Sequence, residues 1–181
     1  GASGDTVNVV GTLQNNGGAL DGVTFKEGGT NFTNSLLVGT DSTGTLNSAD
    51  GNTGVGIGVF AALTTGDNNV AVGLNALTTN TTGSSNIAIG LCSLRLNSTG
   101  AGNTSLGTNS LRCNTTADDN VAIGRSSLRD TTTGATNTAV GTSALNANTT
   151  ADNNVAIGDS ALKTNTTGTR NTGIGTCALN A

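Results

Sequence analysis

Residues 86–94 read Asn-Ile-Ala-Ile-Gly-Leu-Cys-Ser-Leu, and residues 103–111 read Asn-Thr-Ser-Leu-Gly-Thr-Asn-Ser-Leu. The second stretch begins seventeen residues after the first. The arrangement N-x-[AGS]-[VIL]-G-x-x-[ASV]-[LF] recurs at that spacing eight times from residue 52 to the end, without insertion or deletion. A weaker ninth copy at 36–39, Leu-Leu-Val-Gly, precedes them in the same phase. A strict short period is typical of a solenoid in which each repeat forms one structural unit.

Three positions of the repeat keep their chemical character in all eight copies when the copies are aligned on the glycine. An Asn stands four residues before it, Val, Ile or Leu one residue before it, and Leu or Phe four residues after it. We expect the first position to form a ladder of stacked side-chain amides and the other two to line the core. The Asn column comprises Asn52, Asn69, Asn86, Asn103, Asn120, Asn137, Asn154 and Asn171. The predicted core comprises Val55, Val72, Ile89, Leu106, Ile123, Val140, Ile157 and Ile174, together with Phe60, Leu77, Leu94, Leu111, Leu128, Leu145, Leu162 and Leu179.

The segment before each glycine alternates branched and small residues, as in residues 87–89, and this period of two predicts a strand. The polar stretch that follows, typified by N-T-T-G, supplies residues that favour turns. A unit of seventeen residues is too short for two helices and cannot bury its own apolar face, so it must stack on its neighbours. The sequence therefore predicts an all-β fold, a parallel β-solenoid of the β-roll or β-helix kind. With one repeat per coil and coils about 4.8 Å apart, eight coils would form a rod of about 37 Å.

The chain divides into two parts. Residues 52–181 hold the eight repeats, whereas residues 1–51 depart from the pattern apart from the weak first repeat near 35–51. Short strands are expected at 7–10 and 22–25. We interpret residues 1–51 as a capping or transition segment, because the open end of a solenoid exposes a strand edge that must be covered.

The composition argues against an enzyme. The chain has no His, a single Glu at position 27, and scattered Asp residues such as Asp67, Asp118 and Asp152 in the turns before the Asn column. General acid and base catalysis needs titratable groups held together in a pocket, and turn carboxylates are normally solvated. No spacing typical of a metal or cofactor site occurs, so we expect neither. Only 10% of the residues are charged, and apolar residues recur at regular positions. Both features argue against disorder.

The formal net charge of −4 argues against nucleic acid as a partner. No apolar run approaches the ~20 residues that span a bilayer, so we expect no membrane insertion. The chain has three cysteines, an odd number, and they lack a C-x-x-C spacing; they are Cys92, Cys113 and Cys177. We interpret them as small apolar fillers, with an inter-chain disulfide as the alternative.

A cationic column stands five residues after the glycine, in four of five successive copies. It comprises Arg95, Arg112, Arg129 and Lys163, and Asn146 interrupts it. We call these four cations the basic stripe. Stacked like charges repel each other unless anions compensate them. Two interpretations stay open: a site for an acidic glycan or lipopolysaccharide, or a structural column that is either a solvated edge or forms inter-chain salt bridges with the turn Asp residues.

Two further patterns in the turns have alternative interpretations. Five N-x-[ST] triplets recur at one repeat position, and they indicate either a row of glycans or simple turn chemistry. Their acceptor residues are Asn80, Asn97, Asn114, Asn148 and Asn165. The paired Thr residues raise ice binding as a rival function, although ice-binding arrays should occupy a strand face and these pairs lie in turns.

The motif N-x-[AS]-[IV]-G-x-x-[AS]-L followed by N-T-T-G, as at 86–90 and 137–141, resembles repeats of bacteriophage tail fibres. Residues 21–39 look like the lead-in of such fibres, so the resemblance covers about residues 21–181. The motif is also similar to the head repeats of trimeric autotransporter adhesins, whose period is usually shorter.

Both resemblances imply a homotrimer of parallel β-coils that presents surfaces for attachment to a host-surface polysaccharide or protein. The first implies an extracellular location in a virion tail fibre, and the second implies the bacterial cell surface. A third hypothesis is an ice- or glycan-binding solenoid. We expect three coils packed side by side to bury a Leu column that one coil could not.

Overall fold

A computed structural model describes residues 24–29, 32–39 and 46–180. Within these ranges every regular element is a strand and no helix occurs. The strands are β1 (Thr24–Gly29), β2 (Phe32–Gly39), β3 (Ala49–Asp50), β4 (Thr53–Gly56), β5 (Val70–Val72), β6 (Ile87–Ile89), β7 (Thr104–Leu106), β8 (Val121–Ile123), β9 (Thr138–Val140), β10 (Val155–Ile157) and β11 (Thr172–Ile174).

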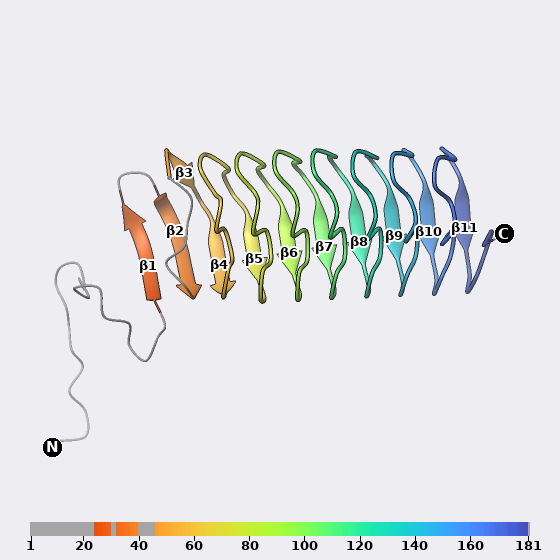
Figure 1. Cartoon of the computed structure of the whole chain (residues 1–181), viewed down its shortest axis with the longest axis horizontal. Coiled ribbons are helices and arrows are strands. Elements are labelled where there is room, and N and C mark those ends of the chain that lie inside the picture. The colour runs from red at the N-terminus through yellow and green to blue at the C-terminus, as the bar shows by residue number, and fades with distance from the viewer. Residues whose placement is uncertain (1–23, 30–31, 40–45, 181) are drawn as a thin grey trace, which may run out of the picture.

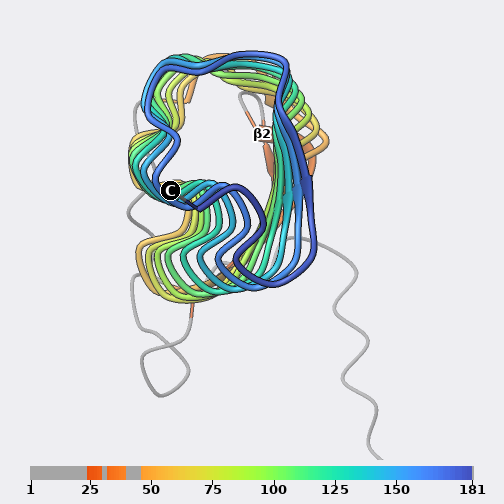
Figure 2. The ribbon, with the colours of Figure 1, turned by 90° about the vertical axis from the view of Figure 1, so that its right-hand side faces the viewer.

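Strands β4 to β11 lie one per coil, and each pairs in parallel with the strand of the next coil. The register offset is seventeen residues, so that Val70 lies opposite Ile87 and Ile87 lies opposite Thr104. The coils follow one another along a rod (Figure 1), and along the rod axis they nearly superpose, with the strands forming one wall (Figure 2). The chain is therefore a parallel β-solenoid with one seventeen-residue repeat per coil.

The first coil continues the same phase into the N-terminal part of the chain. Strand β2 pairs in parallel with β4, again at an offset of seventeen residues, and also with the short β3. Strand β1 pairs with β2 in the antiparallel sense and thereby ends the row of parallel strands (Figure 1). The strand expected at 7–10 lies outside the described residues, whereas Thr24 and Phe25 of the strand expected at 22–25 belong to β1.

Each three-residue strand turns its small central residue inward. In β5 the central Ala71 is fully buried, and Val70 and Val72 on either side are only half-buried. The prediction that the aliphatic column before the glycine lines the core is therefore wrong for a single chain. Among its members Val55, Ile89, Leu106, Ile157 and Ile174 are exposed, and Val72, Ile123 and Val140 are half-buried. The predicted alternation is correct, but the small residues face inward and the branched residues face outward. In a narrow coil only a small side chain fits on the strand's inner face.

The interior is filled instead by the column that follows the glycine. All its members are buried except Leu179 in the last coil. The buried members are Phe60, Leu77, Leu94, Leu111, Leu128, Leu145 and Leu162. These residues have a left-handed backbone, with φ of 49° at Leu94. That conformation costs about 1–2 kcal/mol for an L-residue, and burying a Leu side chain gains about 1.5–3 kcal/mol. Burial therefore outweighs the strain, and one coil buries its own Leu without help from another chain.

The coil that contains β4 shows how closely the two walls are fitted. Here Phe60 replaces Leu, and Gly54 replaces the small residue of the strand that faces it. A Cβ atom on Gly54 would lie 3.0 Å from Phe60 Cδ2 and 2.9 Å from Val59 Cγ1. The loss of one methyl on the strand thus makes room for the larger ring, as close packing requires.

Candidate functional site

The Asn column forms a continuous buried ladder along the solenoid. The backbone N–H and the side-chain Nδ2 of Asn69 both donate to Oδ1 of Asn52, at 3.0 Å each. Nδ2 also donates to the carbonyl oxygen of Gly83 at 2.9 Å, which ties the strand to the opposite turn. The same pattern recurs at Asn86, Asn103 and beyond. The column is structural, because its amides are hydrogen-bonded to neighbouring coils and all but that of Asn171 are buried.

A second Asn column, which the triplet pattern indicated only as a glycan or turn site, also lies inside. Nδ2 of Asn97 donates to Oδ1 of Asn80 at 2.8 Å and to the carbonyl of Gly100 at 2.9 Å. Asn80, Asn97, Asn114 and Asn148 are fully buried. A buried amide cannot receive a glycan in the folded chain, so these four positions serve turn structure.

Thr131 interrupts this second ladder. Oδ1 of Asn114 is buried and has no hydrogen-bond partner, because the Thr131 hydroxyl instead donates to the carbonyl of Asn148 at 3.2 Å. An unpaired buried acceptor costs about 1–3 kcal/mol.

We expect Thr131→Asn to stabilise the chain by about 1 kcal/mol, because the new Nδ2 would donate to Asn114 Oδ1 as in the neighbouring coils. Urea unfolding followed by circular dichroism measures this change. The control is Thr133→Asn on the exposed surface of the same turn, which should leave the midpoint unchanged. A destabilised Thr131→Asn would show that the column does not accept an amide in this coil.

Two of the turn carboxylates make hydrogen bonds between coils. Oδ1 of Asp118 accepts the backbone N–H of Ala101 at 2.7 Å, and Oδ1 of Asp152 accepts that of Ala135 at 2.7 Å. Each bond joins one coil to the preceding one, so the interpretation of these groups as merely solvated is incomplete. Among the described residues no three His, Cys, Asp or Glu side chains are placed to hold a metal.

The cysteines form no disulfide in the described part of the chain. Cys92 and Cys113 are half-buried, whereas Cys177 is exposed, so it is not the apolar filler that was expected. Cys92 and Cys177 occupy the same repeat position, two residues after the glycine, where the backbone is left-handed with φ of 54° and 55°.

The basic stripe lies on the outside of the wall opposite the sheet. The residues two positions before it point inward and contact the strands: Ser93 Oγ lies 2.7 Å from Ser105 Oγ, and Ser127 Oγ donates to the carbonyl of Ala139 at 3.0 Å. The Leu residues just before the stripe are buried as well. The cations follow them on the outer side of the wall, where they are half-buried or exposed. The basic stripe and the outer face of the sheet therefore face different sides of the solenoid.

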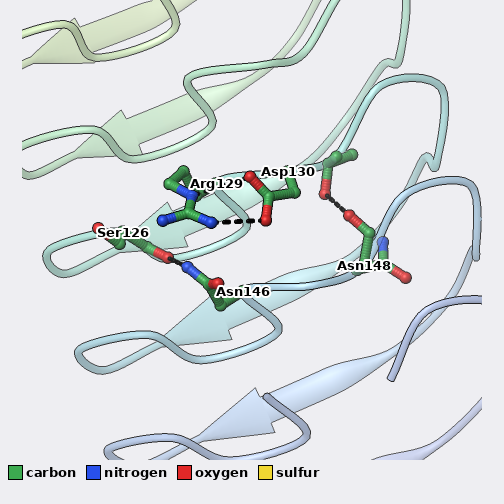
Figure 3. A network of polar contacts seen from close by, with 6 residues as sticks. Ser126, Arg129, Asp130, Asn146 and Asn148 are labelled. Carbon is green, nitrogen blue, oxygen red and sulfur yellow. Dashed lines mark hydrogen bonds and ion pairs between the residues drawn. The ribbon is translucent and has the colours of Figure 1, made fainter. Parts of the chain in front are cut away.

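Among the described residues, only one member of the stripe has an acidic partner. Nε and Nη2 of Arg129 donate to the two carboxylate oxygens of Asp130, each at 2.8 Å, and this hydrogen-bonded pair raises the pKa of Arg129 (Figure 3). In the next coil Asn146 fills the position and donates to the carbonyl of Ser126 at 2.9 Å. The Nε atoms of Arg95 and Arg112 are shielded from water and have no partner. The stripe is thus unevenly neutralised.

The outer face of the sheet carries one column of Val, Ile and Leu and a second column in which Thr replaces Val or Ile in half of the coils. In β6 both Ile87 and Ile89 are exposed, at 41% and 37%. Contiguous apolar surface of this kind is unusual on a monomer and marks an interaction surface. We call it the aliphatic face; it consists of the outward residues of β4 to β11, which also include Thr53, Thr104, Thr138 and Thr172. Sequence reasoning identified these residues but assigned half of them to the interior.

No helix among the described residues is long and apolar enough to cross a bilayer. The chain was compared with models of protein families, with curated proteins and with solved structures, and none of the three comparisons gave a match.

Proposed function

We propose that the chain is a segment of a homotrimeric extracellular fibre, of the kind found in bacteriophage tail fibres, and that it serves host attachment. The observation that carries this proposal is the aliphatic face. Its residues are outward-facing on successive coils and run along the sheet from β4 to β11. The motif's resemblance to fibre repeats supports the same conclusion.

The aliphatic face needs a partner that matches it coil by coil. Each chain buries its own Leu column, so burial of Leu is not the reason for a trimer, contrary to the expectation from sequence. The exposed Val and Ile side chains supply the driving force instead, at about 25 cal/mol per Å² of apolar surface removed from water. A second and third copy, related by a three-fold axis parallel to the rod, would present the same periodic surface.

The remainder of the structure suits a spacer that carries surfaces and does not suit a catalyst. Its polar interior consists of hydrogen-bonded ladders, and its exposed turns repeat the same residues along the rod. A trimeric bacterial adhesin head would have the same design and is the alternative. The neighbouring genes distinguish the two: tail and baseplate genes favour the fibre, whereas a membrane anchor in the same reading frame favours the adhesin.

Ice binding is less well supported by the turn threonines. The first residue of six of the seven pairs uses its hydroxyl within the fold; Thr64 Oγ1, for example, donates to the carbonyl of Thr81 at 2.9 Å. The second residues form the column that is exposed throughout, at Thr65, Thr82, Thr99, Thr116, Thr133, Thr150 and Thr167. A single file offers ice no two-dimensional array.

Light scattering on the purified chain tests the oligomer directly. The wild-type chain should have three times the monomer mass of 17.5 kDa. The double variant Ile89→Lys/Leu106→Lys should be monomeric with an unchanged far-UV spectrum, because burying two unpaired charges per chain costs more than the interface gains.

The control variant is Thr99→Lys/Thr116→Lys, which adds the same charge on an exposed turn column away from the sheet. It should keep the trimer mass. A wild-type monomer, or a sheet variant that keeps the wild-type mass, would contradict the proposal.

A further inference from the structure

A short column of large aliphatic residues borders the aliphatic face in the coils of β4, β5 and β6. It stands one residue after the repeat glycine, outside the strands, and consists of Ile57, Leu74 and Leu91. These side chains are 61%, 47% and 43% exposed. Their coils are joined at this position, because the backbone N–H groups of Asn75 and Cys92 donate to the carbonyls of Ile57 and Leu74 at 2.9 Å each. We call these three residues the aliphatic patch.

The same repeat position is polar in all five coils that follow. Its members there are Thr108, Arg125, Thr142, Asp159 and Thr176. Of these, Arg125, Asp159 and Thr176 are exposed. The outer wall of the solenoid therefore changes along the rod, from aliphatic at this position in the coils of β4 to β6 to polar in the coils of β7 to β11. Contiguous exposed aliphatic residues mark an interaction surface.

Continuity with the aliphatic face indicates that this surface meets a second copy of the chain. Each patch residue follows an outward residue of the face by two positions, as Leu91 follows Ile89, which is about 7 Å along the chain. The patch thus widens the face without a polar gap in the coils of β4 to β6. Residues that extend an apolar interface are buried together with it when the chains associate.

The direction of the change favours parallel chains. A three-fold axis parallel to the rod brings each coil to the level of the same coil in the neighbouring chains, so aliphatic coils meet aliphatic coils. Antiparallel rods that overlap fully would instead set the coil of Leu74 against the coil of Asp159. Burying a carboxylate against apolar groups is costly.

We propose that the aliphatic patch is a chain-to-chain contact, and that the coils of β4 to β6 contribute most of the free energy that holds the chains of the fibre together in parallel. This inference rests on the proposed trimer and goes beyond it by making the interface unequal along the rod. The patch supplies the difference because its side chains leave water on association. In the later coils Arg125 and Asp159 stay solvated at the same position.

Leu91→Thr and Leu96→Thr form a matched pair of variants that tests the patch. Both remove a Leu from the same coil, and each copies the residue at its own repeat position in an adjacent coil, Thr108 and Thr79 respectively. The two side chains are similarly exposed, at 43% and 36%. Leu96, however, follows the basic stripe on the other wall of the solenoid.

Light scattering over a dilution series of the full chain measures the concentration at which half of the trimer has dissociated. Urea below the unfolding transition brings dissociation of a tight trimer into range. Leu91→Thr should raise this concentration about fivefold, and Leu74→Thr/Leu91→Thr about thirtyfold, because half-exposed Leu side chains lose their burial in all three chains. Leu96→Thr and Arg125→Ser/Asp159→Ser should stay within about twofold of the wild type.

A gain of contact provides a test that does not depend on removing a side chain. Thr108→Leu extends the patch by one coil, so it should lower the same concentration about fivefold. An unchanged or raised concentration would contradict the proposal. Far-UV circular dichroism on the same samples confirms that each variant keeps the fold.

The outcomes separate this inference from the trimer itself. If the wild type is trimeric but Leu91→Thr and Leu96→Thr dissociate alike, the patch is not a chain contact and the trimer stands. A wild type that is monomeric at every concentration contradicts both. Dissociation of Arg125→Ser/Asp159→Ser, with Leu74→Thr/Leu91→Thr still assembled, would indicate antiparallel pairing through these charges and would overturn the proposal.

Discussion

Replacing Gly124 with Ala should destabilise the chain by about 3–5 kcal/mol, the largest effect that we expect from adding a single methyl group. Gly124 has φ of +125°, a conformation that L-residues rarely adopt. A Cβ atom there would lie 2.5 Å from the carbonyl oxygen of Gly141 and 2.6 Å from its carbonyl carbon. The expected loss adds about 1–3 kcal/mol of backbone strain to a similar cost of overpacking. The atoms that collide belong to backbone and cannot rotate away.

The last coil offers a control that isolates the collision. Gly175 occupies the same repeat position with φ of +121°, but nothing lies within 4 Å of the place that its Cβ would take, because no coil follows it among the described residues. Gly175→Ala should therefore cost only the strain, about 1–3 kcal/mol at most. Urea unfolding of both variants, followed by circular dichroism, measures the difference. Equal costs would show that coil stacking does not require the glycine.

Truncating the middle of the first Asn ladder, with Asn103→Ala, should destabilise the chain by about 3 kcal/mol. Nδ2 of Asn103 donates to Oδ1 of Asn86 at 3.1 Å and to the carbonyl of Ala117 at 2.8 Å, and its Oδ1 accepts the backbone N–H of Asn120 at 3.1 Å. The Ala variant leaves the Asn120 N–H buried without an acceptor and opens a small cavity. Unpaired buried groups cost about 1–3 kcal/mol each, and lost packing adds to this.

Asn171→Ala in the last coil is the matched control. Asn171 is only half-buried, and its amide donates to Oδ1 of Asn154 at 3.1 Å. Water can replace that bond, so we expect a loss of about 1 kcal/mol or less. The comparison uses the same unfolding assay. If the two variants lose the same stability, the ladder's buried position is not what makes it stabilising.

The candidate site could be predicted only in part. The spacing of Arg95, Arg112 and Arg129 placed three cations on successive coils, and the structure puts them on one wall. The sequence could not show that Asp130 neutralises one of them while two keep shielded, unpaired Nε atoms. That difference depends on side-chain conformation and on which atoms the neighbouring coils cover.

Of the two columns predicted to line the interior, the Leu column after the glycine does so, whereas the aliphatic column before the glycine faces outward. An alternation with a period of two residues indicates that neighbouring side chains face opposite sides of the strand. It does not indicate which of the two sides is the interior. The size of the enclosed space decides that choice. Leu94 fills the coil from the opposite wall and leaves room only for Ala88 on the strand, so Ile87 and Ile89 face outward.

By itself, the sequence determined the all-β class, the seventeen-residue coil and the stacking of like residues, because a period without insertions forces each repeat onto the same conformation. Only the tertiary structure decided that the inner face of the strands is too narrow for Val or Ile, that Asn97 and its column are interior, and that Thr131 breaks their ladder. The physical reason is that burial and hydrogen-bond pairing are properties of the space between coils. A repeat pattern specifies which residues meet across that space, and packing decides which of them fit inside it.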